Sequence, residues 1–188
     1  MFSKSLAFAA LLLATPVFAQ TDGPGPNLVI EVSGSAGGEV VIDLDSDDAP
    51  KHVAQIVALA KSGAYDGVVF HRVIDGFMAQ TGDVQYGKKG GDLSMAGMGG
   101  STLPNLAAEF SSVPFERGVV GMARAQDPDS ANSQFFIMFA PGDFLNGQYT
   151  VVGRVIKGME VVDAIKRGEG QNGEVTDPDV MSKVTVQE

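Results

Sequence analysis

The sequence predicts a mainly β protein, a closed eight-stranded antiparallel barrel capped by two α-helices. Short β-branched or alternating segments recur along the 188-residue chain and are separated by turn residues, with 24 glycines and 9 prolines in all. Most connections between these segments are too short for the crossovers that parallel strands need. Only two stretches have the sequence pattern of a helix. The length suits one domain, and closure of the sheet would leave no unpaired edge.

Two β-hairpins are expected in the first half of the chain. The first joins residues 28–32 to residues 39–45 through a glycine-rich turn. The second joins residues 68–74 to residues 77–81, and Asp75-Gly76 between them is a strong hairpin-turn signal.

Two helices are expected. The first begins at Pro50, in a stretch where apolar residues recur at helical spacing, and Asp47 or Asp48 can cap it. The second spans residues 159–167, with acidic and basic residues at the ends that the helix dipole favours, and stops at Gly168.

The rest of the chain alternates strands and loops. Residues 84–101 are rich in glycine and too irregular for a regular element, so we expect a mobile surface loop there. Four further short segments, each bounded by turn residues, are expected as strands at residues 118–123, 134–139, 150–156 and 181–187.

The N-terminus has the pattern of a bacterial export signal at residues 1–19. Lys4 precedes an apolar run shorter than the roughly 20 residues that span a bilayer, and small residues precede a cleavage point after Ala19. Residues 20–27 then form a glycine- and proline-rich linker, and the folded domain is expected at residues 28–188. The sequence therefore predicts a periplasmic or secreted protein that is not held by a membrane after cleavage.

Composition excludes several function classes. The formal net charge of −10 repels phosphate backbones, so nucleic acid is not an expected partner. The absence of cysteine excludes disulfides, thiolate nucleophiles and cysteine-ligated zinc.

Ordinary catalytic and metal-binding patterns are also missing. His52 and His71 are the only histidines, and neither has the sequence partners of a catalytic triad, so both are expected to be structural. Asp43, Asp45 and Asp47 have the spacing that opens a calcium loop, but the glycine and the closing glutamate of that loop are absent. We expect neither a metal nor a cofactor.

One pattern is highly specific. Residues 70–83 read FHRVIDGFMAQTGD and residues 130–137 read SANSQFFI. Together they resemble the cyclophilin family closely, and the resemblance extends over residues 28–186. It implies a peptidyl-prolyl cis-trans isomerase, built as an eight-stranded barrel with a helix over each open end. The family binds its substrate in a groove on the outer surface and breaks no covalent bond, so no nucleophile is needed.

The resemblance also assigns the site. Arg72 and Gln80 take the catalytic positions. A permanently charged guanidinium suits a reaction in which the amide nitrogen loses conjugation and becomes basic in the twisted transition state. The positions that would bind substrate are Phe77, Met78, Ala123, Arg124, Gln134, Phe136, Phe144, Leu145 and Tyr149. Phe135 and Phe136 should point to opposite faces of their strand, so that one packs inside and the other meets the groove.

Three positions depart from many family members. Phe144 stands where many have Trp, a residue linked to tight cyclosporin binding, so weak binding of cyclosporin is expected. Tyr149 and Arg124 stand where many have His and Asn. Arg124 together with Lys88 and Lys89 is expected to place positive charge beside the groove, which would favour acidic residues near the substrate proline.

The leading hypothesis is an exported monomer that isomerises X-Pro bonds and assists the folding of proline-containing, unfolded or partly folded proteins. A second hypothesis is a proline-peptide binding module or holdase in which isomerisation is incidental. A third is a barrel that carries a small apolar ligand, which requires an empty interior.

Overall fold

The structure, a computed structural model, describes residues 21–188. The export signal predicted at residues 1–19 lies outside these residues. Among the helices that the structure describes, none has the length and apolar character needed to cross a membrane.

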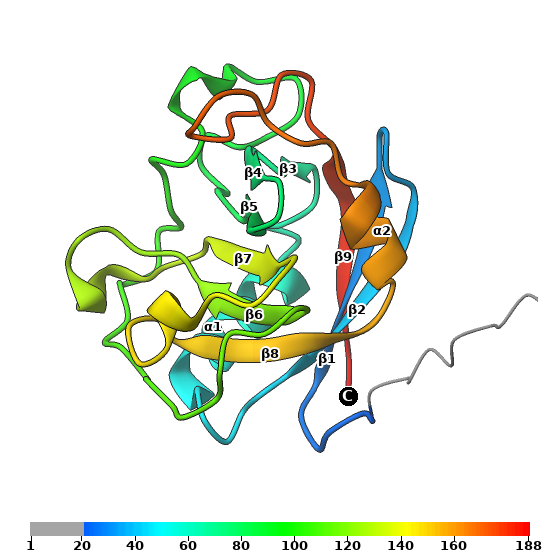
Figure 1. Cartoon of the computed structure of the whole chain (residues 1–188). Coiled ribbons are helices and arrows are strands. Elements are labelled where there is room, and N and C mark those ends of the chain that lie inside the picture. The colour runs from blue at the N-terminus through cyan, green and yellow to red at the C-terminus, as the bar shows by residue number, and fades with distance from the viewer. Residues whose placement is uncertain (1–20) are drawn as a thin grey trace, which may run out of the picture.

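Nine strands form one curled antiparallel sheet (Figure 1). Across the sheet their order is β3-β9-β1-β2-β8-β6-β7-β5-β4. In chain order they are β1 (Asn27–Ser33), β2 (Gly38–Leu44), β3 (Val68–Val69), β4 (Arg72–Ile74), β5 (Met78–Thr81), β6 (Val119–Met122), β7 (Phe135–Met138), β8 (Val151–Lys157) and β9 (Val180–Gln187).

The prediction of a closed eight-stranded barrel is wrong. The strand expected at residues 68–74 is divided into β3 and β4, which lie at opposite edges of the sheet and do not pair with each other. Between them, the Phe70 amide donates to the Asp179 carbonyl at 2.9 Å, and the His71 carbonyl accepts from the Val175 amide at 3.1 Å. Because the backbone at this break bonds to the segment before β9, residues 70–71 carry the chain from one edge of the sheet to the other. No β-ladder joins β3 to β4, so the sheet stays open.

The first predicted hairpin is confirmed, and the second is confirmed only for residues 72–74 of its first strand. β1 pairs with β2, and β4 pairs with β5. The turn of the second hairpin contains Gly76, whose φ of 68° lies in the left-handed region that favours glycine. The strands predicted farther along the chain begin and end within about two residues of β6, β7, β8 and β9.

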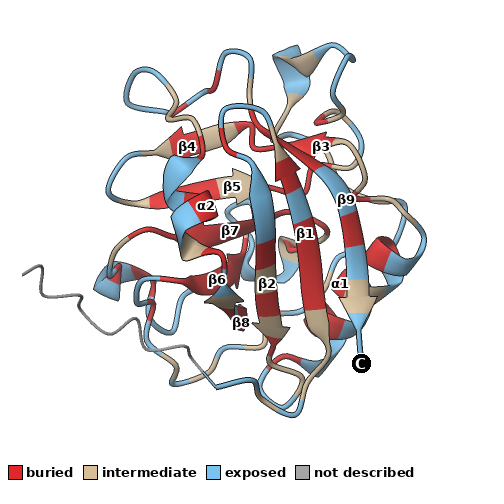
Figure 2. Ribbon diagram, turned by 90° about the vertical axis from the view of Figure 1, so that its right-hand side faces the viewer, coloured by how far each residue is buried: buried red, intermediate tan, exposed pale blue. Residues whose placement is uncertain are grey.

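The main core fills the concave side of the sheet. Buried residues dominate the strands and exposed residues the connecting loops (Figure 2). One apolar cluster takes side chains from nearly every strand and from both helices, including Leu28, Ile42, Val53, Phe135 and Val162. The hypothesis of a barrel that carries an apolar ligand is therefore wrong, because the interior is packed with side chains.

A second, smaller apolar cluster lies on the opposite face of the sheet. Phe135 belongs to the main core, whereas Phe136 joins the second cluster, as the alternation of strand residues predicts. Other members of this cluster are Met78, Phe115, Val119, Met138, Leu145 and Val151. This outer cluster forms the base on which the candidate site is built.

The helix α1 (Pro50–Lys61) packs against β9 and begins at Pro50 as predicted. Its N-cap is Ala49, which offers no side-chain acceptor, so the expected cap by Asp47 or Asp48 is wrong. The carboxylate of Glu109, from the long segment between β5 and β6, accepts from the first-turn amides instead, with 3.1 Å to the amide of His52. A distant loop thus supplies the cap that the local sequence lacks.

The helix α2 (Met159–Ala164) packs against β2 and is shorter than predicted. It ends at Ala164, and Ile165 already has an extended conformation. Gly168 is not its C-terminal stop, because its amide donates to the Val73 carbonyl at 2.8 Å. Three short 3-10 turns complete the structure: η1 (Leu93–Met95), η2 (Pro128–Ser130) and η3 (Asp143–Leu145).

Candidate active site

Arg72 is the first residue of β4 and lies opposite Gln80 of β5 in the strand pairing. Its Nη1 donates to Gln80 Oε1 at 3.1 Å, and its Nε donates to the Asn172 carbonyl at 3.0 Å. Burial lowers the pKa of Arg72 from its ordinary value. A guanidinium nevertheless stays charged at neutral pH, so the side chain is a fixed, half-buried cation.

A chain of amides extends from Arg72 across the sheet. Gln80 Nε2 donates to Gln134 Oε1 at 2.9 Å. Gln134 Nε2 in turn donates to the carbonyls of Gly97 and Gly99, at 3.0 and 2.7 Å. The side-chain oxygen of Gln80 therefore faces the Arg72 guanidinium, and the side-chain NH₂ group of Gln80 is held by Gln134.

Beside Arg72 lies an open hollow of about 500 Å³, whose lining includes the buried apolar side chains of Met78, Phe136 and Leu145. Every residue predicted for the site lines it except Gln134, which reaches it through Gln80. The lining residues are Arg72, Phe77, Met78, Gln80, Ala123, Arg124, Phe136, Phe144, Leu145, Gln148 and Tyr149. They come from β4, β5 and the turn between them, from the loop after β6, from β7, and from η3 and the loop after it, so segments far apart in the chain meet at one place.

Aromatic rings shape this hollow. Phe136 is buried at its base and stacks on Phe115, with ring centroids 5.8 Å apart. Tyr149 meets Phe136 edge-on at 5.9 Å. At the rim, Phe77 contacts Phe144, which is 71% exposed. The result is an apolar cup with a rigid base and an accessible lip, suited to a small apolar ring.

The expected positive charge beside the hollow is only partly present. Lys88 lies elsewhere, because its Nζ donates to the carbonyls of Ala64 and Asp66 at 2.6 and 2.7 Å. Arg124 does line the hollow, but its guanidinium donates to backbone carbonyls, including that of Gln148 at 2.9 Å. It also lies 4.4 Å from the ring centre of Tyr149. The prediction that Lys88 adds positive charge beside the hollow is therefore wrong. Arg124 does lie beside the hollow, but its N–H groups already donate to backbone carbonyls.

Gln148 was missed by the sequence analysis. It lines the hollow, and its carbonyl accepts from both Nε and Nη2 of Arg124. A contribution made by a backbone carbonyl leaves no trace in residue type, so no motif could have indicated it.

The two histidines have different surroundings. The buried His52 ring contacts Glu109 at 2.6 Å, at the start of α1. His71 is buried behind Arg72, and neither of its ring nitrogens has a hydrogen-bond partner among residues 21–188. Burial lowers the pKa of His71 from its ordinary value of 6.5, against the opposing charge of Asp83. The ring is therefore neutral at pH 7, and the hollow contains no histidine.

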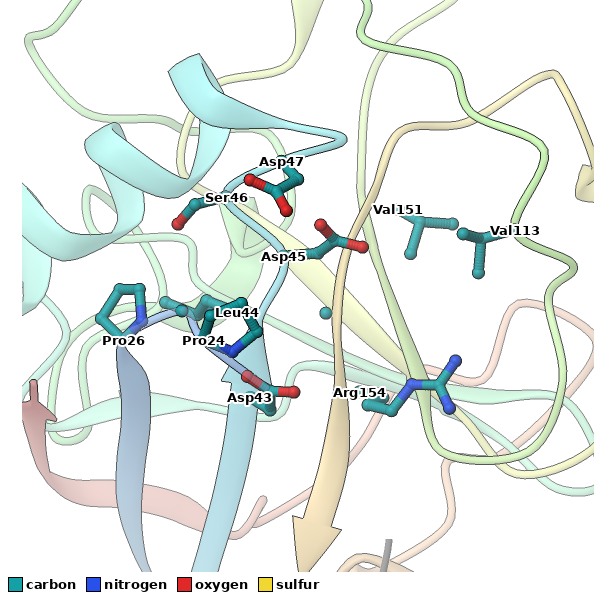
Figure 3. A pocket seen from close by; sticks show the side chains of 12 residues that line it. Pro24, Pro26, Asp43, Leu44, Asp45, Ser46, Asp47, Val113, Val151 and Arg154 are labelled. Carbon is teal, nitrogen blue, oxygen red and sulfur yellow. The ribbon is translucent and has the colours of Figure 1, made fainter. Parts of the chain in front are cut away.

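A second hollow, of about 380 Å³, lies between the end of β2 and β8 and is lined by Asp43, Asp45, Asp47 and Arg154 (Figure 3). Burial raises the pKa of Asp43, although its carboxylate accepts from the Gly23 amide at 3.0 Å. In residues 21–188 no three histidine, aspartate or glutamate side chains are placed to hold a metal ion. This hollow is lined by three carboxylates and by no aromatic ring, so the hollow beside Arg72 is the better candidate for binding an apolar ring.

Comparison with known proteins agrees with this geometry. The family model described as cyclophilin type peptidyl-prolyl cis-trans isomerase/CLD matches residues 28–186. A probable peptidyl-prolyl cis-trans isomerase of Brucella suis is 54% identical over 184 residues, which cover 96% of this chain and 92% of the relative. Peptidyl-prolyl cis-trans isomerase A of Dickeya dadantii is 35% identical over 178 residues, covering 92% of this chain and 88% of the relative.

Solved structures give the same answer. A Cryptosporidium parvum cyclophilin, crystallised in the presence of the dipeptide Ala-Pro, matches with a TM-score of 0.73 at 25% identity, over 86% of this chain and 99% of that one. Cyclophilin AquaCyp293 of Hirschia baltica matches with a TM-score of 0.72 at 27% identity, over 88% of this chain and 75% of that one. The chain therefore belongs to the cyclophilin-type peptidyl-prolyl cis-trans isomerases and is an enzyme of that class.

Proposed function

We propose that this isomerase turns X-Pro bonds by holding the proline ring in the apolar hollow and presenting Arg72 to the twisted amide. The observation that carries the proposal is the position of the Arg72 guanidinium, fixed by Gln80 at the wall of the cup. Arg124 is the other cation that lines the hollow among the residues that the structure describes, but its guanidinium already donates to backbone carbonyls.

The mechanism follows from the electronic structure of the amide. Rotation about the bond meets a barrier of about 18–20 kcal/mol, because the nitrogen shares its lone pair with the carbonyl. At the top of that barrier the lone pair is localised on nitrogen, and a hydrogen-bond donor aimed at it stabilises the transition state more than either planar ground state. Arg72 supplies such a donor without giving up its proton, so the reaction needs neither a covalent intermediate nor a cofactor.

The ring and the acyl part of the substrate play different roles. The ring would rest on Phe136, Met78 and Leu145, which are buried and packed together in the outer cluster. Gln80 would keep the guanidinium from following the rotating acyl group, because its own amide is tied to Gln134. A fixed ring and a fixed donor leave the acyl part as the group that turns.

We further propose that the enzyme acts outside the cytoplasm, in the periplasm or after secretion, as a monomer that assists the folding of exported proteins. The export-signal pattern at residues 1–19 supports this location. Slow X-Pro isomerisation, which takes tens to hundreds of seconds without catalysis, gives such clients a step to accelerate.

The role of Arg72 is tested by cis-trans exchange of Ala-Xaa-Pro-Phe peptides, followed by NMR, with the wild type and Arg72→Ala. Losing one such donor typically costs on the order of 10² to 10³ in rate, and we expect a loss of that size. Arg117→Ala is the matched control, because Arg117 pairs with Asp163 at 2.6 Å and does not line the hollow. Wild-type rates in a folded Arg72→Ala protein would reject the mechanism.

The same variants separate the enzyme from a holdase. If catalysis is the function, Arg72→Ala loses its acceleration of proline-limited refolding. If the protein works mainly by binding proline-containing chains, suppression of client aggregation survives Arg72→Ala while peptide exchange is lost. Both assays use the protein at the same concentration, and circular dichroism confirms that each variant is folded.

A further inference from the structure

Asp83, the residue that follows the glycine after β5, is fully buried and lies outside the hollow. Its carboxylate accepts four backbone hydrogen bonds. Oδ1 accepts from the amides of Gln85 and Tyr86 at 3.0 and 2.8 Å, and Oδ2 accepts from those of Gly97 and Gly99 at 2.7 and 2.9 Å. One buried charge thus holds both ends of the glycine-rich segment at residues 84–101, which the sequence predicted to be a mobile loop.

The held end of this loop presents two carbonyls to the active site. Those of Gly97 and Gly99 both accept from Gln134 Nε2, at 3.0 and 2.7 Å. Two acceptors at this place require the NH₂ end of the Gln134 amide. The loop carbonyls therefore determine which end of the Gln134 side-chain amide faces the loop.

The orientation of the Gln134 side-chain amide determines that of Gln80. With its NH₂ end toward the loop, Gln134 offers Oε1 to Gln80, and Gln80 must then present its own Oε1 to Arg72. If Gln134 were reversed, Gln80 would meet a donor and would turn its NH₂ end toward the guanidinium, where two donors would face each other. The loop carbonyls thus fix the polarity of the whole chain up to Arg72.

We propose that Asp83 is a positioning residue for the isomerase, which sets the orientation of Arg72 through the glycine-rich loop, Gln134 and Gln80. This inference rests on the proposed role of Arg72. Asp83 itself touches no part of the hollow, so its effect on catalysis is indirect.

The local sequence fits this role. A carboxylate is an acceptor only, so it can satisfy four amides at once, whereas the NH₂ of asparagine would face amide donors. The loop also approaches too closely for larger residues. A Cβ on Gly99 would lie 2.5 Å from Asp83 Oδ1, and Gly97 has a φ of 96° with the His71 ring 3.2 Å from where its Cβ would be. Glycine at both places lets the loop backbone reach the carboxylate.

The first test is Asp83→Asn, assayed with proline peptides by NMR exchange at several substrate concentrations. We expect kcat/KM to fall by roughly 10- to 100-fold, mainly through kcat, because the proline cup is intact and the donor is misplaced. The Arg72 side-chain NH resonances should shift as their hydrogen bond to Gln80 changes. Unchanged kcat/KM and unchanged Arg72 resonances in the folded variant would overturn the proposal.

Asp179→Asn is the matched control. Asp179 is also buried, and its carboxylate also holds loop amides, those of Ala36 and Lys166, at 2.9 and 2.7 Å. Its side chain makes no contact with the amide chain that leads to Arg72. This variant should lose stability without a comparable loss of kcat, so an equal loss of kcat in both variants would count against a specific role for Asp83.

Gly99→Ala provides a second variant should Asp83→Asn fail to fold. The added methyl group would clash with Asp83 Oδ1 and with the side chains of Gln85 and Tyr86, so the loop must move away from Asp83. We expect the same loss of kcat. Gly37→Ala is its control, because a Cβ there has open space around it. A folded Gly99→Ala protein with wild-type kcat would reject the proposal.

A double-mutant cycle separates this inference from the proposed mechanism. If Asp83 acts through Arg72, Asp83→Asn causes no further loss of kcat/KM in an Arg72→Ala background. An equal loss in both backgrounds would show that Asp83 acts by another route. If Arg72→Ala alone keeps the wild-type rate, the mechanism itself fails, whereas loss in Arg72→Ala without loss in the Asp83 and Gly99 variants rejects only the positioning role.

Discussion

Arg72, Gln80 and Phe136 occupy one row across three neighbouring strands. Arg72 lies opposite Gln80 between β4 and β5, and Gln80 lies opposite Phe136 between β5 and β7. Directly opposed residues share a face of the sheet, so the register alone brings the cation, its partner and the apolar floor together. The row continues to Gly121 of β6, where a Cβ would come within 2.6 Å of the rings of Phe115 and Phe136. A residue without a side chain there leaves room for the stacked pair.

Phe144 allows a prediction at the same scale. It is exposed at the rim and contacts Phe77, but it has no indole NH to donate. We expect the wild type to bind cyclosporin weakly and Phe144→Trp to bind it at least several-fold more tightly. The chain contains no tryptophan, so the introduced indole is the only one and its fluorescence reports binding directly.

Phe144→Tyr is the control for this prediction, because it adds a polar group to the ring without an indole. Equal affinity of the wild type and Phe144→Trp for cyclosporin would show that this position does not decide drug binding.

At the scale of elements, α1 depends on a loop distant in sequence. Glu109 accepts from the amides of Lys51 and His52 and from the His52 ring, at 3.1, 3.1 and 2.6 Å. Its pKa is lowered, because these hydrogen bonds outweigh the opposing effect of burial. An acidic group at a helix N-terminus also complements the helix dipole. The loop between β5 and β6 is thereby fastened to α1.

Glu109→Gln should lower the free energy of unfolding by about 1 kcal/mol at neutral pH, as expected for a weakened helix cap. Because the pKa of Glu109 is lower in the folded than in the unfolded protein, its contribution is present above about 4.5 and is lost as the pH falls further, through the folded-state value. Urea unfolding between pH 7 and pH 3 measures this. The variant should lose less stability on acidification than the wild type, and parallel curves would contradict the assignment.

At the scale of the whole molecule, the open sheet has two short edges, and both are covered. β3 contains 2 residues and β4 contains 3. The Val69 amide donates to the Gly87 carbonyl at 2.8 Å, and the Val73 amide donates to the Gly173 carbonyl at 2.7 Å. Two loops thus bond to backbone amides at the two edges of the sheet, and these amides are not free to pair with a strand of a second copy.

This arrangement supports the proposed monomer, and with the export signal it gives one prediction for the mature protein. Expressed with its own N-terminus in a bacterium, the protein should be recovered from the periplasm or the medium with Gln20 as its first residue, and should sediment as a single chain. The sheet begins only at Asn27, so cleavage after Ala19 leaves every strand whole. Intact mass and sedimentation velocity measure both points. An uncleaved cytoplasmic product would contradict export, and a stable dimer would contradict the monomer.

Much of this architecture could be predicted because local sequence sets local structure. Alternation placed Phe135 and Phe136 on opposite faces, Asp75-Gly76 marked a hairpin, and Pro50 marked the start of α1. The motif around Arg72 identified the family. The same motif also predicted residues that line one hollow in the fold, because a long sequence pattern specifies the strands and the register in which they pair.

Only the tertiary structure decided which groups satisfy the polar atoms that local sequence leaves free. The break at Phe70 and His71 opened the predicted barrel, Glu109 replaced the expected cap of α1, and Asp83 tied down a loop that composition alone made look loose. In each case the bond involves a backbone group or a partner far away in the chain. Residue type indicates whether a side chain faces the core or the solvent. It does not indicate which acceptor a backbone amide bonds to, because that depends on how distant segments pack together.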